Sequence, residues 1–210
     1  MNWEQLPLGP LQTNCYIISN REKECLVIDP GSEGNKLIQH LQKRGLKPIA
    51  VLLTHAHFDH IGAVDDVRNE YKIPVYIHRL EKKWLGNPAK NGSNAFLGQS
   101  IAAEDADHLI DEETTLNAGS FSCKVLETPG HSPGSISFFF EESGFVVSGD
   151  ALFAGSIGRT DLPEGNHRQL IKSIHDKLLN LPEDTVVLPG HGQDTTIGAE
   201  MDSNPFLNGF

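Results

Sequence analysis

A run of six residues in the first third of the chain carries four side chains of the kinds that bind metal ions: His55, His57, Asp59 and His60. Imidazole and carboxylate groups suit zinc, iron and manganese, and one loop with four of them concentrates the donors that such an ion needs. With His and Asp each taken as about 5% of residues, the pattern HxHxDH arises by chance in about one such chain in a thousand. A strand-like segment, residues 47–54, precedes the run, and a helix-like segment, residues 63–71, follows it. The fold must therefore build a metal site at a strand-to-helix loop.

Three further donors stand beside glycines in later turns: His131, Asp150 and His191. Each one alone is more typical of a turn residue or a hydrogen-bonded polar group than of a ligand. Each also follows a strand-like segment, so the three loops can gather at the edge of a sheet. Together with the histidine run, they predict a metal site with seven ligands, five histidines and two aspartates.

The pattern of apolar residues predicts an α/β protein. Strands are expected at residues 11–19, 25–29, 47–54, 75–77, 114–116, 121–128, 135–140, 145–148 and 185–188. Helices are expected from Ser32 to a glycine cap at Gly45, over residues 63–71 and over residues 166–179. Strands followed by a helix occur twice, which predicts two sheets packed face to face with helices outside, a four-layer αββα sandwich. All 210 residues are expected to form one domain, residues 1–210.

Charge and apolar pattern restrict the partners. A formal net charge of −11 opposes binding to nucleic-acid phosphates. No apolar run reaches the roughly 18 residues of a membrane span, and the N-terminal segment has no secretory signal pattern. We therefore expect a cytoplasmic protein with no nucleic-acid or membrane partner. Three cysteines without C-x-x-C spacing predict reduced, partly buried thiols: Cys15, Cys25 and Cys123.

The order of the candidate ligands resembles that of the metallo-β-lactamase superfamily, in which HxHxDH is followed by a later His, a later Asp and a last His. Within it, the segment Gly149–Asp161, GDALFAGSIGRTD, is similar to small bacterial relatives of glyoxalase II, the hydroxyacylglutathione hydrolases. The resemblance covers nearly the whole chain. It implies the metallo-β-lactamase fold and a centre of two divalent metal ions, with zinc expected first and iron or manganese as alternatives.

The resemblance also implies how the ligands divide between the two ions. The first ion would be bound by His55, His57 and His131, the second by Asp59, His60 and His191, and both by Asp150. Each ion then has three donors of its own and a shared carboxylate, which leaves room for a bridging hydroxide. Asp29, which follows a predicted strand, would orient one of the ligands.

Such a centre implies hydrolysis. Metal binding lowers the pKa of water from about 15.7 toward about 7, and the bridging hydroxide would attack an acyl carbonyl, with Asp59 and Asp150 as catalytic carboxylates. The resemblance to glyoxalase II implies an S-2-hydroxyacyl thioester of a small thiol as the substrate, which fits such a centre because a thiolate, with a pKa of about 8.5, leaves without a strong general acid. Arg159 matches a basic substrate-binding position of glyoxalase II, or serves as a structural arginine of the loop. Asp161 and Gln193 stand near the positions of its aromatic glutathione contacts, so the identity of the thiol stays open.

Other activities remain as alternatives. A persulfide dioxygenase resembles the chain in the same loop and would hold one iron with His55, His131 and Asp150. A β-lactamase or a nuclease could use the same scaffold, although the family's lactamases usually differ at the position of His60. A non-enzymatic metal module fits poorly, because glycine-flanked ligands around an open site are unusual for a structural site. Five histidines lack ligand spacing and are expected at the surface or in the core: His40, His78, His108, His167 and His175.

Overall fold

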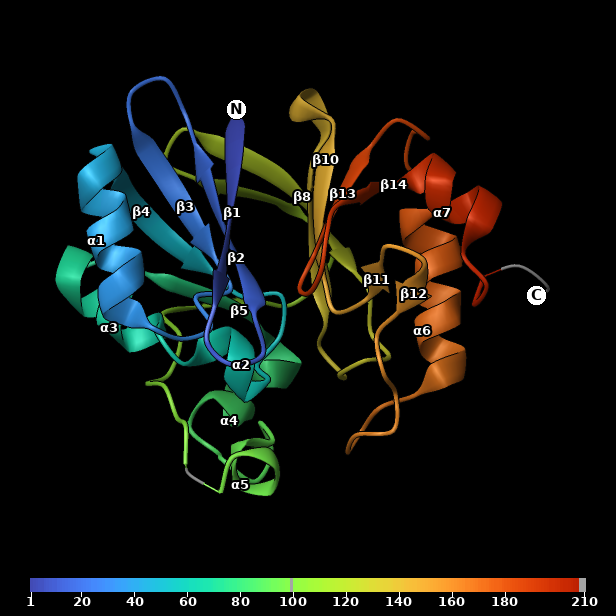
Figure 1. Cartoon of the computed structure of the whole chain (residues 1–210), viewed down its shortest axis with the longest axis horizontal. Helices are drawn as coiled ribbons and strands as arrows, with labels where there is room; N and C mark the ends of the chain where they lie inside the picture. The colour runs from blue at the N-terminus through green and yellow to red at the C-terminus, as the bar shows by residue number, and fades with distance from the viewer. Residues whose placement is uncertain (99, 208–210) are drawn as a thin grey trace. The chain divides into compact units, whose positions relative to one another are not determined.

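The computed structural model describes residues 1–98 and 100–207 (Figure 1). The chain divides into two compact units. The first comprises residues 1–111 with residues 118–121, and the second comprises residues 112–117 and the chain from residue 122 onward. Each unit is built on one six-stranded sheet. The prediction of one domain over residues 1–210 stays a prediction, and its positions 99 and 208–210 lie outside the described residues.

The sheet of the first unit has the strand order β1-β2-β3-β4-β5-β6. Strands β1 to β3 pair antiparallel, whereas β3 to β6 run parallel. Because parallel neighbours end at the same edge of a sheet, residues that follow β3 and β4 lie side by side. The strands are β1 (Asn2–Leu8), β2 (Thr13–Ser19), β3 (Glu24–Ile28), β4 (Lys47–Leu52), β5 (Val75–His78) and β6 (His108–Ile110).

Two helices of the first unit, α1 (Gly34–Arg44) and α3 (Val64–Tyr71), contact each other and β4 (Figure 1). Leu37 and Leu41 of α1 and Val64 and Val67 of α3 pack into one apolar core with the strands. Helix α1 ends at Gly45, whose φ of 65° is left-handed, as the sequence predicts for a glycine cap. The shorter helical segments are α2 (Phe58–Ile61), η1 (Arg79–Glu81), α4 (Lys82–Leu85) and α5 (Ser93–Phe96).

The sheet of the second unit has the order β14-β13-β10-β9-β8-β7. Strands β10 and β13 are parallel, whereas β8, β9 and β10 are antiparallel. The strands are β7 (Thr115–Ala118), β8 (Phe121–Glu127), β9 (Ile136–Phe140), β10 (Phe145–Gly149), β13 (Val186–Pro189) and β14 (Thr195–Thr196). Strands β11 (Leu152–Phe153) and β12 (Ser156–Ile157) form a separate hairpin.

Two helical segments complete the second unit. Helix α6 (His167–Ser173) continues into the π-helical turn η3 (Ile174–Leu178), and α7 (Ile197–Ser203) follows β14. Leu170, Ile174 and Ile197 from these segments pack with Val146 and Val187 of the sheet. The turn η2 (Glu141–Ser143) joins β9 to β10. The core of this unit therefore lies between its helices and its sheet.

The structure adds elements that the apolar pattern does not predict. Strand β1 pairs with β2 along seven residues, although Glu4, Gln5 and Pro7 interrupt its apolar pattern. The helix predicted over residues 166–179 is present but changes from α-helical to π-helical at Ile174. Residues 80–107, which show no periodicity, contain most of η1, which begins at Arg79, together with α4 and α5. Strand β1 is defined by its pairing with β2, which the apolar pattern along a single strand does not encode.

Two predictions about composition can be compared with the structure. Among the residues described, no helix combines the length and apolar character that crossing a bilayer requires. All three cysteines are free, as predicted, and they are almost completely buried rather than partly buried. Burial raises the pKa of the Cys25 and Cys123 thiols to about 12. Thiolates are therefore scarce at neutral pH, and the cysteines are poor candidates for nucleophilic catalysis.

Candidate metal centre

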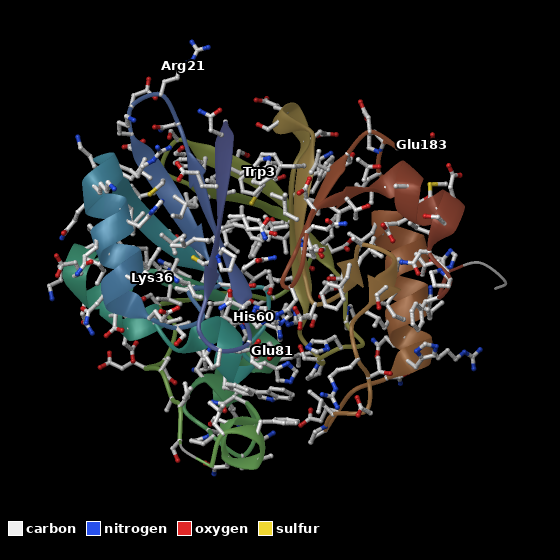
Figure 2. All side chains as sticks on the ribbon, in the orientation of Figure 1. Trp3, Arg21, Lys36, His60, Glu81 and Glu183 are labelled. Carbon is white, nitrogen blue, oxygen red and sulfur yellow. The ribbon has the colours of Figure 1, made fainter. Side chains whose placement is uncertain are left out.

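The histidine run follows strand β4, as predicted, but its second half lies in the short helix α2 rather than in a loop. Strand β4 ends at Leu52, an irregular segment follows, and α2 begins at Phe58. The His55 and His60 side chains are fully buried, with ring centroids 4.1 Å apart, and the His55 and His57 centroids are 4.9 Å apart. Figure 2 labels His60 in this part of the first unit. Three imidazoles are thus gathered within one short stretch of chain.

Asp29 holds two of these imidazoles in a fixed orientation. Its Oδ2 accepts hydrogen bonds from His60 Nδ1 at 3.0 Å and from the Thr54 hydroxyl at 2.6 Å, and its Oδ1 accepts the Thr54 amide at 2.8 Å. Because the one hydroxyl proton of Thr54 goes to Asp29, Thr54 Oγ1 accepts a hydrogen bond from His55 Nδ1 at 3.0 Å. Both imidazoles therefore carry the proton on Nδ1 and present the Nε2 lone pair, which is the form that binds a metal.

Asp59 lies in the first turn of α2 and has its own support. Thr13 Oγ1 donates a hydrogen bond to Asp59 Oδ2 at 2.8 Å, and the same oxygen lies 3.5 Å from His60 Nε2. A Cβ at Gly31 would come within 2.0 Å of the Asp59 carbonyl oxygen. Only glycine therefore lets the loop after β3 approach α2 this closely.

A buried glutamate supports the backbone of the histidine run. Glu81 lies in η1, is fully buried, and accepts a hydrogen bond from the Ala56 amide at 3.1 Å (Figure 2). Ala56 lies between His55 and His57, so this bond anchors the peptide that joins two candidate ligands. A buried carboxylate is costly unless it is hydrogen-bonded. No sequence pattern points to Glu81, because it belongs to the segment without periodicity.

The second unit carries the other three candidate ligands in loops after its strands. Asp150 follows β10 and His191 follows β13, and these strands are parallel neighbours that end at the same edge. Asp150 Oδ2 lies 3.5 Å from His131 Nε2 and 3.6 Å from His191 Nε2. His131 Nδ1 donates to the Arg159 carbonyl oxygen at 2.8 Å, so His131 also presents the Nε2 lone pair. All three ligands predicted in this unit converge.

The donors within each unit fit divalent metal ions. Two ligand atoms bound at about 2.1 Å in a tetrahedral arrangement lie about 3.4 Å from each other. The separations between His Nε2 and Asp Oδ2 are 3.5 Å for His60 and Asp59, 3.5 Å for His131 and Asp150, and 3.6 Å for His191 and Asp150. These separations are longer than hydrogen bonds and match ligands of a shared ion. Mixed imidazole and carboxylate donors suit zinc, iron or manganese.

Arg159, the predicted substrate contact, forms a bidentate ion pair within its own loop. Its Nε and Nη2 lie 2.8 Å and 2.7 Å from the Asp161 carboxylate oxygens. The hydrogen bond from Arg159 is the largest effect that lowers the pKa of Asp161, to about 2. Both side chains are more than half exposed. A substrate carboxylate would therefore compete with Asp161 for this guanidinium.

A second buried glutamate, which the sequence does not mark, holds the β11–β12 hairpin to α7. Glu200 Oε2 accepts hydrogen bonds from the Gly155 amide at 2.9 Å and from Asn204 Nδ2 at 2.7 Å, and Oε1 accepts the Thr195 hydroxyl at 2.7 Å. Asn204 Nδ2 also donates to the Ser156 carbonyl oxygen at 3.1 Å. In the sequence, the hairpin lies between Asp150 and Arg159, whose carbonyl oxygen orients His131. Glu200 is therefore a positioning residue for this part of the centre.

Glu200→Ala is expected to lower metal affinity about tenfold, because residues that support metal ligands contribute about 10–100-fold to metal affinity. It should also change the visible spectrum of Co²⁺-substituted protein. Glu200→Gln should restore the metal affinity and the spectrum. Its amide oxygen can accept from Gly155 and Asn204, and its NH₂ group can donate to the Thr195 hydroxyl. Thr196→Ala is the control: it removes the N-cap of α7, lowers stability by about 1 kcal/mol and leaves the spectrum unchanged. An unchanged Co²⁺ spectrum in Glu200→Ala would contradict the positioning role.

The five histidines without ligand spacing have other surroundings. The His40 and Glu4 side chains lie 3.0 Å apart, His78 accepts the Leu80 amide, and the His108 ring lies 4.5 Å from the Tyr76 ring. His167 and His175 belong to α6 and η3. In the part of the chain that the structure describes, none of the five joins a group of potential metal ligands.

Residues 8–191 match the family model of the metallo-beta-lactamase superfamily. The match spans most of the chain, so the protein belongs to this superfamily, and the predicted fold class, an α/β protein with the metallo-β-lactamase fold, is confirmed. The chain is 52% identical over 210 residues to the probable metallo-hydrolase YqgX of Bacillus subtilis (strain 168), covering 100% of this chain and 99% of that protein. It is 39% identical over 209 residues to the hydroxyacylglutathione hydrolase GloC of Haemophilus influenzae, covering 99% of each.

Two crystal structures show the same similarity in three dimensions. The BLEG-1 B3 metallo-beta-lactamase superposes with a TM-score of 0.98 at 53% identity, covering 99% of this chain and 100% of that one. TTHA1623 in a di-iron-bound form superposes with a TM-score of 0.86 at 41% identity, covering 97% of this chain and 100% of that one.

Proposed function

We propose that the protein is a metal-dependent hydrolase that cleaves S-2-hydroxyacyl thioesters of a small thiol. The observation that carries this proposal is the orientation of three imidazoles. His55, His60 and His131 each donate Nδ1–H to a fixed acceptor, so each offers Nε2 as a ligand. The similarity to a hydroxyacylglutathione hydrolase supports thioester cleavage as the reaction.

The proposed centre holds two divalent ions with the seven ligands. His55, His57 and His131 would hold the first ion, Asp59, His60 and His191 would hold the second, and Asp150 would contact both. The two short separations from Asp150 Oδ2, to His131 and to His191, support its shared role. Zinc is the first candidate metal, and the di-iron form of TTHA1623 makes iron the main alternative before manganese.

When bound, such ions supply a water molecule activated near neutral pH and polarise the acyl carbonyl. The residues of the chain provide the positioning. Thr13 fixes the carboxylate of Asp59, and Asp29 and the Arg159 carbonyl fix the imidazoles. Asp59 and Asp150 are the proposed catalytic carboxylates because both would contact the ions. Since a thiolate with a pKa of about 8.5 leaves readily, no dedicated general acid is required.

The proposed role of Arg159 is to bind a carboxylate of the thiol part of the substrate. Asp161→Asn removes the competing anion, so we expect the KM of S-lactoylglutathione, which carries carboxylates, to fall about two- to fivefold, as for an exposed ion pair. The KM of a lactoyl thioester of N-acetylcysteamine, which carries none, should not change. Arg159→Ala should raise only the first KM. Equal changes for both thioesters in steady-state assays would contradict this role.

Metal analysis and a substrate panel test the proposed function. Protein purified without added metal should contain two divalent ions per chain and should hydrolyse thioesters equally well with and without oxygen. One iron per chain and oxygen-dependent formation of sulfite from a persulfide would instead identify a dioxygenase. A protein that binds two ions but leaves every thioester intact would overturn the thioesterase proposal.

Hydrolysis of β-lactams is the second candidate function, because the chain is 53% identical to the BLEG-1 B3 metallo-beta-lactamase. In thioester hydrolysis and in β-lactam hydrolysis, activated water attacks a carbonyl carbon. The proposed centre is therefore chemically suited to both reactions. The metal-loaded protein is therefore compared on nitrocefin and on S-lactoylglutathione. A higher kcat/KM for nitrocefin would replace thioesters by β-lactams as the proposed substrates.

A further inference from the structure

A small apolar pocket lies against the candidate ligand Asp59, within the first unit. Its volume is about 70 Å³. It is lined by the β1–β2 hairpin, by Phe58 at the start of α2 and by the segment that follows α5. The apolar side chains that line it are Leu8, Pro10, Leu11, Phe58, Leu97 and Ile101.

The lining of the pocket determines which groups it accepts. Apart from Asp59, its polar side chains are the uncharged Thr13 and Ser32, and no Lys, Arg or His belongs to its described lining. The Thr13 hydroxyl donates its proton to Asp59. A charged acyl chain would lose its hydration here without gaining a partner among the side chains of the described lining, which include no cation, so the pocket favours an uncharged, apolar chain.

The volume of the pocket limits the size of that group. An engineered apolar cavity of about 150 Å³ binds benzene, which has six carbons. A pocket of about half that volume has room for about three carbons. An acyl chain of two or three carbons fits, whereas a six-carbon chain does not.

The approach to the pocket is also apolar. Leu11 is 49% exposed although it lines the pocket, and Phe96, which is 50% exposed, stacks on Phe58 with centroids 6.2 Å apart. Single exposed apolar residues are common at protein surfaces. Here Leu11 lines the pocket and Phe96 packs on a residue that lines it, so both add exposed apolar surface beside the pocket.

We propose that this pocket binds the acyl chain of the substrate and restricts it to short, uncharged chains of two or three carbons. This inference rests on the proposed function, because it places the acyl part of a thioester beside the carboxylate that would hold the second ion. The hydroxyl of a 2-hydroxypropionyl group adds no charge, so that group fits the same lining.

A series of thioesters of N-acetylcysteamine tests the proposal, with acetyl, 2-hydroxypropionyl, hexanoyl and succinyl groups. The metal-loaded protein should show a kcat/KM about tenfold or more lower for hexanoyl and for succinyl than for 2-hydroxypropionyl, since one ill-fitting methylene costs about tenfold or more. Leu97→Ala should raise the ratio of hexanoyl to 2-hydroxypropionyl kcat/KM about tenfold, and Leu11→Trp should lower kcat/KM for every substrate larger than acetyl. Leu80→Ala, at an exposed position that does not line the pocket, is the control and should leave the ratios unchanged.

Binding provides a readout that does not depend on turnover. Propionamide, which is uncharged, should shift the methyl NMR signals of Leu97 and Ile101 when it is added to the zinc-loaded protein, whereas hexanamide should shift them at least tenfold more weakly at equal concentration. If thioesters are cleaved with no dependence on chain length in any variant, the pocket assignment is wrong while the proposed function stands. If no thioester is cleaved but propionamide shifts these signals, the proposed function fails and the pocket stands. Absence of the shifts overturns the pocket assignment.

Discussion

The Asp150→Ala protein is expected to retain fewer than two metal ions per chain and to lose about 1000-fold or more in kcat/KM. The reason is the position of one oxygen atom. Asp150 Oδ2 lies 3.5 Å from His131 Nε2 and 3.6 Å from His191 Nε2, so its removal takes a ligand from both proposed ions. Substitution of a residue that only supports a metal ligand costs about 10–100-fold in metal affinity or activity, and loss of a ligand shared by two ions should cost more.

Metal content and activity are measured on the same preparations. Asp150→Asn retains one carbonyl oxygen, so it should bind more metal than Asp150→Ala while remaining far below the unaltered protein in kcat/KM. Asp176→Asn is the matched control, because it removes an exposed carboxylate of the same unit that pairs with Lys172. Two ions per chain and unchanged activity in Asp150→Ala would refute the shared ligand.

The candidate ligands could be proposed from the sequence because their signal is local. HxHxDH is a pattern within six residues, and the strand before it and the glycines beside Asp150 and His191 are also local features. Asp29 was predicted as an orienting residue because it follows a strand, and the structure confirms its contact with His60. The helix cap at Gly45 is local in the same sense.

The supporting contacts could not be predicted, because they join residues far apart in the chain. Thr13 reaches Asp59 across 46 positions, and Gly155 reaches Glu200 across 45. Glu81 and Glu200 look like ordinary helix residues until the fold buries them. The sequence therefore predicts candidate metal ligands, whereas the structure shows which side chains hold those candidates in place.

Asp29 is the supporting residue with the largest expected effect, because its carboxylate accepts directly from His60 Nδ1 and also orients the Thr54 hydroxyl beside His55. Asp29→Asn replaces the acceptor that faces His60 Nδ1 and the Thr54 hydroxyl by an NH₂ group, which is a donor. The Asn NH₂ group and His60 Nδ1–H would both be donors. His60 avoids this clash only by carrying its proton on Nε2, and a proton on Nε2 blocks metal binding at that nitrogen. The Thr54 hydroxyl can turn to accept from Asn, but it still accepts from His55. The substitution therefore acts mainly on the ion that His60 binds.

We expect Asp29→Asn to weaken binding of the second ion about 10–100-fold and to lower kcat/KM in proportion, as chelator competition and steady-state assays would measure. In EDTA, which removes the contribution of bound metal, the free energy of unfolding of the Asp29→Asn protein should be about 1–3 kcal/mol lower. The reason is that the buried hydrogen-bonding groups around residue 29 would no longer be correctly paired. Thr54→Val removes the acceptor of His55 and one donor to Asp29 but keeps the contact between Asp29 and His60, so it should affect mainly the first ion, and Thr54→Ser should restore that ion. ¹⁵N NMR of the imidazoles is decisive: His60 should carry its proton on Nδ1 in the unaltered protein and on Nε2 in Asp29→Asn. If His60 keeps the Nδ1 proton and two ions bind with unchanged affinity, Asp29 contributes to stability alone and does not select the metal-binding form of the site.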